Sequence, residues 1–158
     1  MAATGLRHHP QCAGGLDERL AGAFAEADGP ALLIGMDTPQ LTPGLLAVDW
    51  RVADAWFGPA ADGGFWGLGL RVPDAALVRG VPMSTAGTGA IQLARLNAAG
   101  LRVARLPVLR DVDTAADAVS VARLAPRTRF AAQVRELAPV LDPARSARPV
   151  GATARARP

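Results

Sequence analysis

The sequence predicts an α/β protein with a three-layer α/β/α arrangement around a mostly parallel sheet. Short apolar runs alternate with amphipathic segments along the chain, as strands and helices do in such folds. The run at 31–36 is continuously apolar, which is typical of a strand covered on both faces. Acidic residues follow several of the predicted strands, at the edge where this fold class places its ligands.

The first half of the chain contains a helix, a strand and a short helix, in that order. Apolar residues at helical spacing predict a helix over 16–28, and Gly29 with Pro30 ends it. The strand at 31–36 leads directly into Asp37. Thr42 followed by Pro43 predicts the N-cap and first position of a helix that continues through Leu46.

The middle of the chain predicts two strands, a helix and a further strand. The strands are 55–57 and 65–70, with a turn at Asp62-Gly63-Gly64 between them. A helix over 87–99 is expected to be capped by Ser84 or Thr85 and ended by Gly100. The last predicted strand is 101–106.

The chain's last part predicts two helices and a tail. Thr114 and Asp117 have the spacing of a capping box, and a final helix is expected at about 127–137. From Pro139 onward, Pro, Ala and Arg dominate, which predicts disorder. We therefore expect a flexible start at 1–10, a partial domain at 11–138 and a disordered tail at 139–158.

Composition argues against several function classes. The 17 basic residues are all Arg, and residues 1–142 hold 13 of them together with all 14 acids. The folded body is thus close to neutral, which does not suit a nucleic-acid binder. No apolar run is long enough to cross a membrane. Cys12 is the single cysteine, so we expect a cytoplasmic protein without internal disulfides.

Three acidic loops are candidates for chemistry: 35–39 with Asp37, 62–64 with Asp62, and 111–114 with Asp111 and Asp113. Carboxylates that converge at strand ends form a hard-oxygen site for Mg²⁺ or Mn²⁺. Each loop also has a purely structural interpretation. Asp37 and Asp113 can cap helices, and Asp62 is an ordinary turn residue before glycine.

Three motifs resemble a bacterial family of GT-A-type glycosyltransferase-like proteins, also described as radical-SAM/selenodomain-associated transferases. They are Ile34–Leu41, Phe57–Leu70 with its Gly-Pro-x-x-Asp-Gly-Gly-aromatic run, and Asp111–Thr114. The resemblance covers about residues 11–124. The family is related to guanylyltransferases that act on molybdopterin and on phospholactate.

The resemblance implies roles for particular residues. Asp37 would be the principal metal ligand and a catalytic acid, with Asp111 and Asp113 as further ligands and Asp62 as a second catalytic carboxylate. Gly63 and Gly64 would line the substrate side. Trp66, beside this turn, is more simply a core residue, but it is also the best aromatic candidate for stacking on a sugar. Arg19, near the head of the resembling region, is a further candidate for substrate binding.

The resemblance implies a metal-dependent transferase that acts on a nucleotide-activated sugar with Mg²⁺ or Mn²⁺. Two alternatives remain: a nucleotidyltransferase with a GTP-like donor, and a non-catalytic remnant that binds a partner. The Gly-rich, basic nucleotide loop that opens this fold does not precede Gln11. We therefore expect an N-terminally truncated fold, self-association through an open sheet edge, and no transfer by this chain alone.

Overall fold

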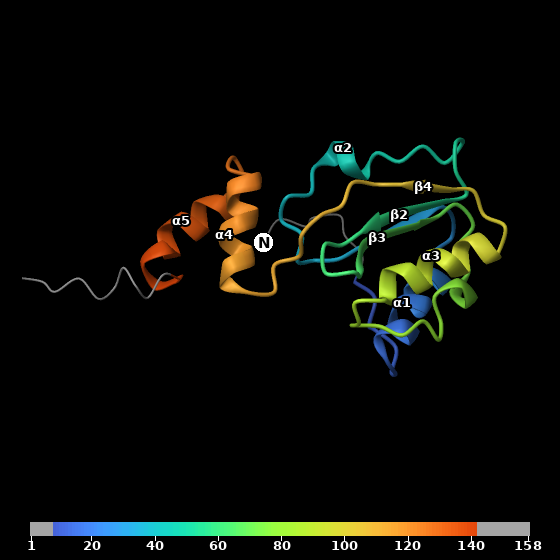
Figure 1. Ribbon diagram of the computed structural model, residues 1–158. Coiled ribbons are helices and arrows are strands. Elements are labelled where there is room, and N and C mark those ends of the chain that lie inside the picture. Colours follow the sequence, from blue (N-terminus) through green and yellow to red (C-terminus); the bar gives the residue numbers. More distant parts are fainter. Residues whose placement is uncertain (1–7, 142–158) are drawn as a thin grey trace, which may run out of the picture. The chain divides into compact units, whose positions relative to one another are not determined.

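The computed structural model describes residues 8–141, so the predictions for 1–7 and 142–158 lie outside the described residues. The chain divides into two compact units, Met1–Asp111 and Val112–Pro158, and each is considered by itself. The first unit contains all the strands that the structure describes. Figure 1 shows them as one sheet beside the helices α1 and α3.

The sheet has four strands in the order β1-β3-β2-β4. Their bounds are Ala31–Ile34 for β1, Ala55–Pro59 for β2, Phe65–Leu70 for β3 and Val103–Arg105 for β4. β3 pairs antiparallel with both β1 and β2, whereas β2 pairs parallel with β4. The expectation of mostly parallel pairing was wrong, because the few residues from Ala60 to Gly64 allow only a hairpin between β2 and β3.

One consequence of this mixed topology concerns the strand ends. β1 and β2 are both antiparallel to β3, so they run in the same direction, and β4 runs with β2. The carboxyl ends of β1, β2 and β4 therefore lie at the same end of the sheet, where β3 begins. The loops that follow these ends carry the acidic residues that the sequence singles out.

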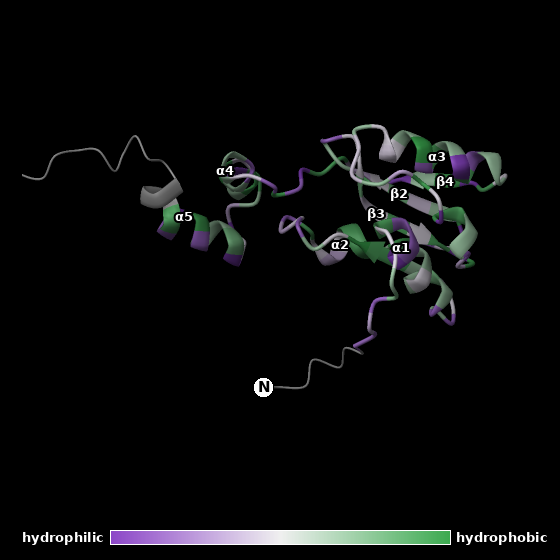
Figure 2. Ribbon diagram, turned by 90° about the horizontal axis from the view of Figure 1, so that it is seen from below, coloured by the Kyte–Doolittle hydropathy of each residue, from purple (hydrophilic) through white to green (hydrophobic). Residues whose placement is uncertain are grey.

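One face of the sheet is covered by α1 (Leu16–Ala25), α3 (Thr88–Ala98) and a 3-10 turn, η1 (Ala75–Leu77). Buried side chains from these elements and from the sheet form the core: Ala21, Phe24, Ala55, Phe57, Leu68, Leu70, Val78 and Leu96. Figure 2 shows both hydrophobic and hydrophilic residues on α3, and its buried residues Thr88, Gln92 and Leu96 recur every four positions, as on a helix with one core-facing side.

The opposite face is covered differently. Trp66 lies against Gly58, and Trp50 lies against Gly69, where a side chain on either glycine would collide with the indole. The helix nearest this face is α2 (Pro43–Leu46), a single turn that Thr42 caps by accepting a hydrogen bond from the backbone N–H of Leu45. A full third layer of helices is thus not confirmed for the described residues.

The predicted termini of α3 were partly correct. Gly87, and not Ser84 or Thr85, occupies the N-cap, although the Thr85 hydroxyl accepts a hydrogen bond from the Gly87 N–H. At the other end, Gly100 follows the helix with a φ of +74°, a left-handed conformation that glycine adopts at little cost.

The second unit contains α4 (Ala115–Leu124) and α5 (Arg129–Leu141), which pack through Ala118, Ala122, Ala131 and Val134. The capping box at the start of α4 is confirmed, because the Thr114 hydroxyl accepts from the Asp117 N–H and the Asp117 carboxylate accepts from the Thr114 N–H. α5 continues to Leu141, so the prediction that the tail begins at Pro139 was too early. Across the described residues, no helix is both long and apolar enough to span a membrane.

Candidate functional site

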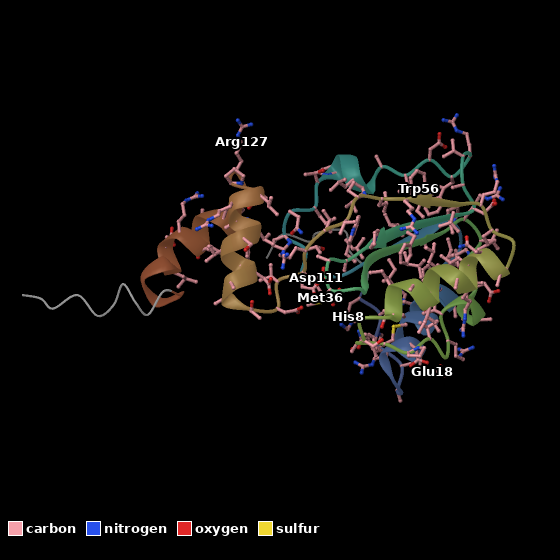
Figure 3. All side chains as sticks on the ribbon, in the orientation of Figure 1. His8, Glu18, Met36, Trp56, Asp111 and Arg127 are labelled. Carbon is pink, nitrogen blue, oxygen red and sulfur yellow. The ribbon has the colours of Figure 1, made fainter. Side chains whose placement is uncertain are left out.

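A cavity of about 700 Å³ lies where β1, β2 and β4 end. Two of the acidic loops reach it through Asp37 and Asp62, and Asp111, the last residue of the first unit, also belongs to its lining. Residues of α1 and of the 83–88 loop complete the wall. Figure 3 shows the labelled Met36 and Asp111 at this end of the sheet, whereas the labelled Trp56 lies toward the other end of the strands.

Asp37 is exposed in the loop that follows β1. Within the described part of the chain it makes no hydrogen bond or ion pair, and the cap of α2 is Thr42. The structural interpretation of Asp37 as a helix cap is therefore wrong. A charged side chain at the cavity wall with no structural partner is available to a ligand or a cation.

Asp62 has a structural partner of its own. Its Oδ1 accepts a hydrogen bond of 2.8 Å from the Gly64 N–H, which closes the turn between β2 and β3. Gly63 has a φ of +93°, and a Cβ there would lie 2.1 Å from the carbonyl oxygen of Ala86. The Gly63 carbonyl also accepts from the Gly89 N–H. Gly63 thus packs on the start of α3 and does not line the cavity, whereas Gly64 does.

Trp66 does not lie in the cavity wall. It is 1 % exposed, its ring covers Gly58, and its indole N–H donates to the Pro107 carbonyl at 2.9 Å. The burial leaves no ring face for a sugar, so the structure supports the core interpretation of Trp66 and not the substrate-binding one.

The remaining predicted residues separate into two groups. Arg19 is exposed on α1 and lines the cavity. Asp113 lies in the second unit just before the capping box, and its position relative to Asp37 is not described. Among the described residues, no three His, Cys, Asp or Glu side chains are close enough together to hold a metal ion.

Charge is unevenly distributed around the cavity. Its lining includes four carboxylates and one guanidinium, those of Glu26, Asp37, Asp62, Asp111 and Arg19. One of these acids has a polar neighbour, since Glu26 Oε2 lies 3.2 Å from His9 Nδ1. An anionic ligand therefore needs additional positive charge to bind here, which a divalent cation would supply.

Two kinds of cavity-lining residue were not identified by the sequence analysis. The first is apolar: Leu16, Ile34 and Met36 are exposed and line the cavity, although nothing in their local pattern distinguishes them from core positions. The second is Ser84, which has a φ of +57° in the 83–88 loop. A non-glycine residue in this conformation is uncommon and is found disproportionately at functional sites.

The fold agrees with that of a solved structure. The chain is similar to a candidate nucleotide-diphospho-sugar transferase from Desulfovibrio desulfuricans G20, with a TM-score of 0.73 and 27% sequence identity. The similarity covers 83% of this chain and 63% of that one, so this chain spans less than two thirds of the length of its structural neighbour. The fold is thus that of a nucleotide-diphospho-sugar transferase-like protein.

The chain belongs to the family DUF2064, described as uncharacterized proteins conserved in bacteria, whose model matches residues 1–85. The matched residues include α1, β1, β2, β3 and the loops of Asp37 and Asp62. A comparison with curated proteins gives no match.

Proposed function

We propose that this chain is a glycosyltransferase-like protein of the GT-A type that binds a nucleotide-activated sugar with Mg²⁺ or Mn²⁺. The observation that carries the proposal is the shared cavity of Asp37, Asp62 and Asp111 at the carboxyl ends of β1, β2 and β4. The likeness to a candidate nucleotide-diphospho-sugar transferase supports it. Since the chain spans only part of that protein, activity of this chain alone is a separate question.

The donor set fits a hard divalent cation. Asp37 and Asp111 supply carboxylate oxygens to the same cavity, which is the ligand type that Mg²⁺ and Mn²⁺ prefer. The described residues do not provide a three-acid cage, but Mg²⁺ is commonly held by one or two carboxylates, with substrate phosphates and water completing its coordination. When bound, the cation would neutralise charge on the leaving diphosphate.

Other lining residues have roles that follow from their chemistry. Arg19 would donate hydrogen bonds to donor phosphates, and Gly64 would let a ligand approach the backbone closely. In the transfer, the acceptor hydroxyl oxygen forms a bond to the anomeric carbon while the bond from that carbon to the diphosphate breaks. Asp62, which keeps one carboxylate oxygen beyond its turn, would take the hydroxyl proton.

A nucleotidyltransferase would use the same acids with a nucleoside triphosphate, so the two transferase activities are distinguished by the donor that binds.

A partner-binding function is favoured by one different observation. Among the residues that the structure describes, β1 has a strand neighbour on one side only, and Ile34 at its end is 41% exposed. An open strand edge with apolar residues is a surface on which another chain can pair.

The experiment is calorimetric titration with Mn²⁺ and a panel of nucleotide sugars and nucleoside triphosphates. We expect Mn²⁺-dependent binding of a nucleotide sugar, which Asp37→Asn abolishes without changing the melting temperature. Asp28→Asn, which removes an exposed acid outside the cavity, is the matched control. Equal binding by the Asp37 variant and the parent would remove the metal assignment, and binding of a triphosphate alone would favour nucleotidyl transfer.

A further inference from the structure

Segment 107–110, which follows β4, is hydrogen-bonded through its backbone to β3 and to the end of β2. Pro107 accepts from the Trp66 indole N–H at 2.9 Å, and Leu109 accepts from the Ala61 N–H at 2.8 Å. The Leu109 N–H in turn donates to the Pro59 carbonyl. These bonds fix the segment to β3 and to the end of β2, beside the Asp62 turn.

The same segment is bound to the loop that follows β1. The Gln40 side chain donates from Nε2 to the Arg110 carbonyl at 2.7 Å, across a separation of 70 residues. Arg110 immediately precedes Asp111, and Gln40 lies three residues after Asp37. The amide therefore ties together the two backbones that carry these cavity acids.

The loop between Asp37 and Gln40 is itself compact. Thr38 is 2% exposed, and its carbonyl accepts a hydrogen bond from the Leu41 N–H. Because the turn is buried at Thr38 and closed by this hydrogen bond, we expect a displacement of Gln40 to displace Asp37 as well. Within the described residues the Gln40 Oε1 is buried without a hydrogen-bond partner, so the amide is held here by what its Nε2 donates.

We propose that Gln40 is a positioning residue that sets the separation of Asp37 and Asp111 and thereby their joint affinity for a divalent cation. The inference rests on the proposed function for the identity of the site, but the tie between the two loops stands on the structure alone. Residues that hydrogen-bond a metal-ligating side chain commonly change the metal affinity about 10- to 100-fold when they are replaced. Gln40 bonds the backbone beside Asp111 and not the ligand itself, so we expect an effect at the lower end of that range.

The test uses Gln40→Met, which keeps the length and approximate volume of the side chain and removes its donor. Gln133→Met, in the second unit, is the matched control, since that glutamine bonds only locally to Glu136. The readouts are Mn²⁺ affinity by calorimetry and hydrogen exchange of the backbone over 35–41. The Mn²⁺ titration is repeated for Gln40→Met in the Asp37→Asn and Asp111→Asn backgrounds.

We expect Gln40→Met to weaken Mn²⁺ binding by about tenfold and to accelerate exchange over 35–41, with neither change in Gln133→Met. Because Gln40 acts through the two acids, the loss should be much smaller once either acid has been removed. A general structural defect would instead lower the melting temperature and leave the affinity at low temperature unchanged.

The outcomes separate the two proposals. If the parent does not bind Mn²⁺ but Gln40→Met accelerates exchange over 35–41, the proposed metal-dependent function fails and the tie made by Gln40 stands. If Mn²⁺ binds with the same affinity to Gln40→Met and to the parent, the positioning role is overturned. If the parent does not bind Mn²⁺ and Gln40→Met leaves the exchange rate over 35–41 the same as in the parent, the positioning role is also overturned.

Discussion

Asp54 accepts three hydrogen bonds from Arg102: its Oδ2 accepts from the backbone N–H at 3.1 Å and from Nε at 3.0 Å, and its Oδ1 accepts from Nη2 at 3.3 Å. Arg71 also pairs with this carboxylate, which is 16% exposed. Asp54 precedes β2, Arg71 follows β3 and Arg102 precedes β4, so the carboxylate joins three strands at the end opposite the cavity. Asp54 thus stabilises the sheet at the end opposite the candidate site.

The pKa of Asp54 is lowered from 3.8 to about 2, chiefly by the hydrogen bonds from Arg102. Its depressed pKa means that the folded state favours the charged carboxylate, so Asp54 contributes stability above pH 3.8. That contribution is lost as the pH falls from 3.8 toward about 2. We expect Asp54→Asn to lower the melting temperature by several degrees at pH 7 and to have a much smaller effect at pH 2, by calorimetry or circular dichroism.

Asp49 provides the control for this prediction. The Arg51 guanidinium also lowers the pKa of Asp49 to about 2, but the two residues are exposed and only two positions apart. Such a pair also forms in the unfolded chain, so it adds little to folding stability. Asp49→Asn should leave the melting temperature nearly unchanged, and an equal loss in the two variants would contradict the role of Asp54.

Much of the fold could be predicted because its signals are local. Helices and strands appear close to where periodicity, caps and glycines place them, including the Thr42 cap and the Thr114–Asp117 capping box. The pairing direction was missed although its signal is present. The connection from Pro59 to Phe65 is too short for a parallel crossover, which needs a dozen residues or more.

The candidate site could be predicted only in part, for a similar reason. Asp37, Asp62 and Asp111 follow strands, so their position at one sheet edge follows from the order of elements. Gln40 could not be identified, since its partner is a backbone carbonyl 70 residues away and no local pattern reports such a contact. Trp66 kept two interpretations at the sequence level, because an aromatic residue beside a glycine turn has the same local sequence whether it faces a ligand or the core.

Among the glycines with a positive φ, Gly63 is predicted to be the one that tolerates substitution least. Gly63→Ala places a methyl group 2.1 Å from the Ala86 carbonyl oxygen, in addition to the strain of a φ of +93°. Gly100→Ala is the matched control, since its φ is +74° but no atom lies within 4 Å of the added Cβ. The control should cost about 1–2 kcal/mol from backbone strain alone.

Denaturant unfolding measures both variants. We expect Gly63→Ala to lose clearly more free energy of unfolding than Gly100→Ala, because the added contact is with backbone that cannot rotate away. Similar losses would show that the turn and the 83–88 loop move apart at little cost, and that Gly63 is needed only for its backbone conformation.

The open edge of β1 predicts self-association. β1 pairs with β3 on one side, and the described residues place no strand on its other side. We expect light scattering to show a concentration-dependent mass above that of one chain. Ile34→Lys should restore the monomer, because a lysine on an edge strand opposes pairing with another strand.

Ile91→Lys is the matched control for this experiment. Ile34 and Ile91 are 41% and 40% exposed, but Ile91 lies on α3 and away from the edge. Dissociation by the Ile34 variant only would locate the contact at β1. Dissociation by both variants, or a parent that stays monomeric at high concentration, would contradict edge pairing.

Arg19 is predicted to contribute to the binding of a phosphate-bearing donor. It is the one guanidinium among the cavity-lining residues that the structure describes, and four carboxylates share the wall with it. A hydrogen bond from a charged donor is worth about 1.5–3 kcal/mol, and the exposure of Arg19 favours the lower end of this range. Arg19→Gln should therefore weaken nucleotide-sugar binding in the presence of Mn²⁺ by about tenfold.

The measurement is a calorimetric titration with Mn²⁺ present and again after chelation with EDTA. Arg123→Gln removes an exposed arginine of the second unit and should bind the donor as the parent does. Chelation should abolish binding by every variant, since one guanidinium cannot offset four carboxylates and the charge of a diphosphate together. Donor binding that survives chelation with Arg19 intact would mean that the cavity holds phosphate without a cation, and an Arg19→Gln affinity equal to that of Arg123→Gln would remove Arg19 from the site.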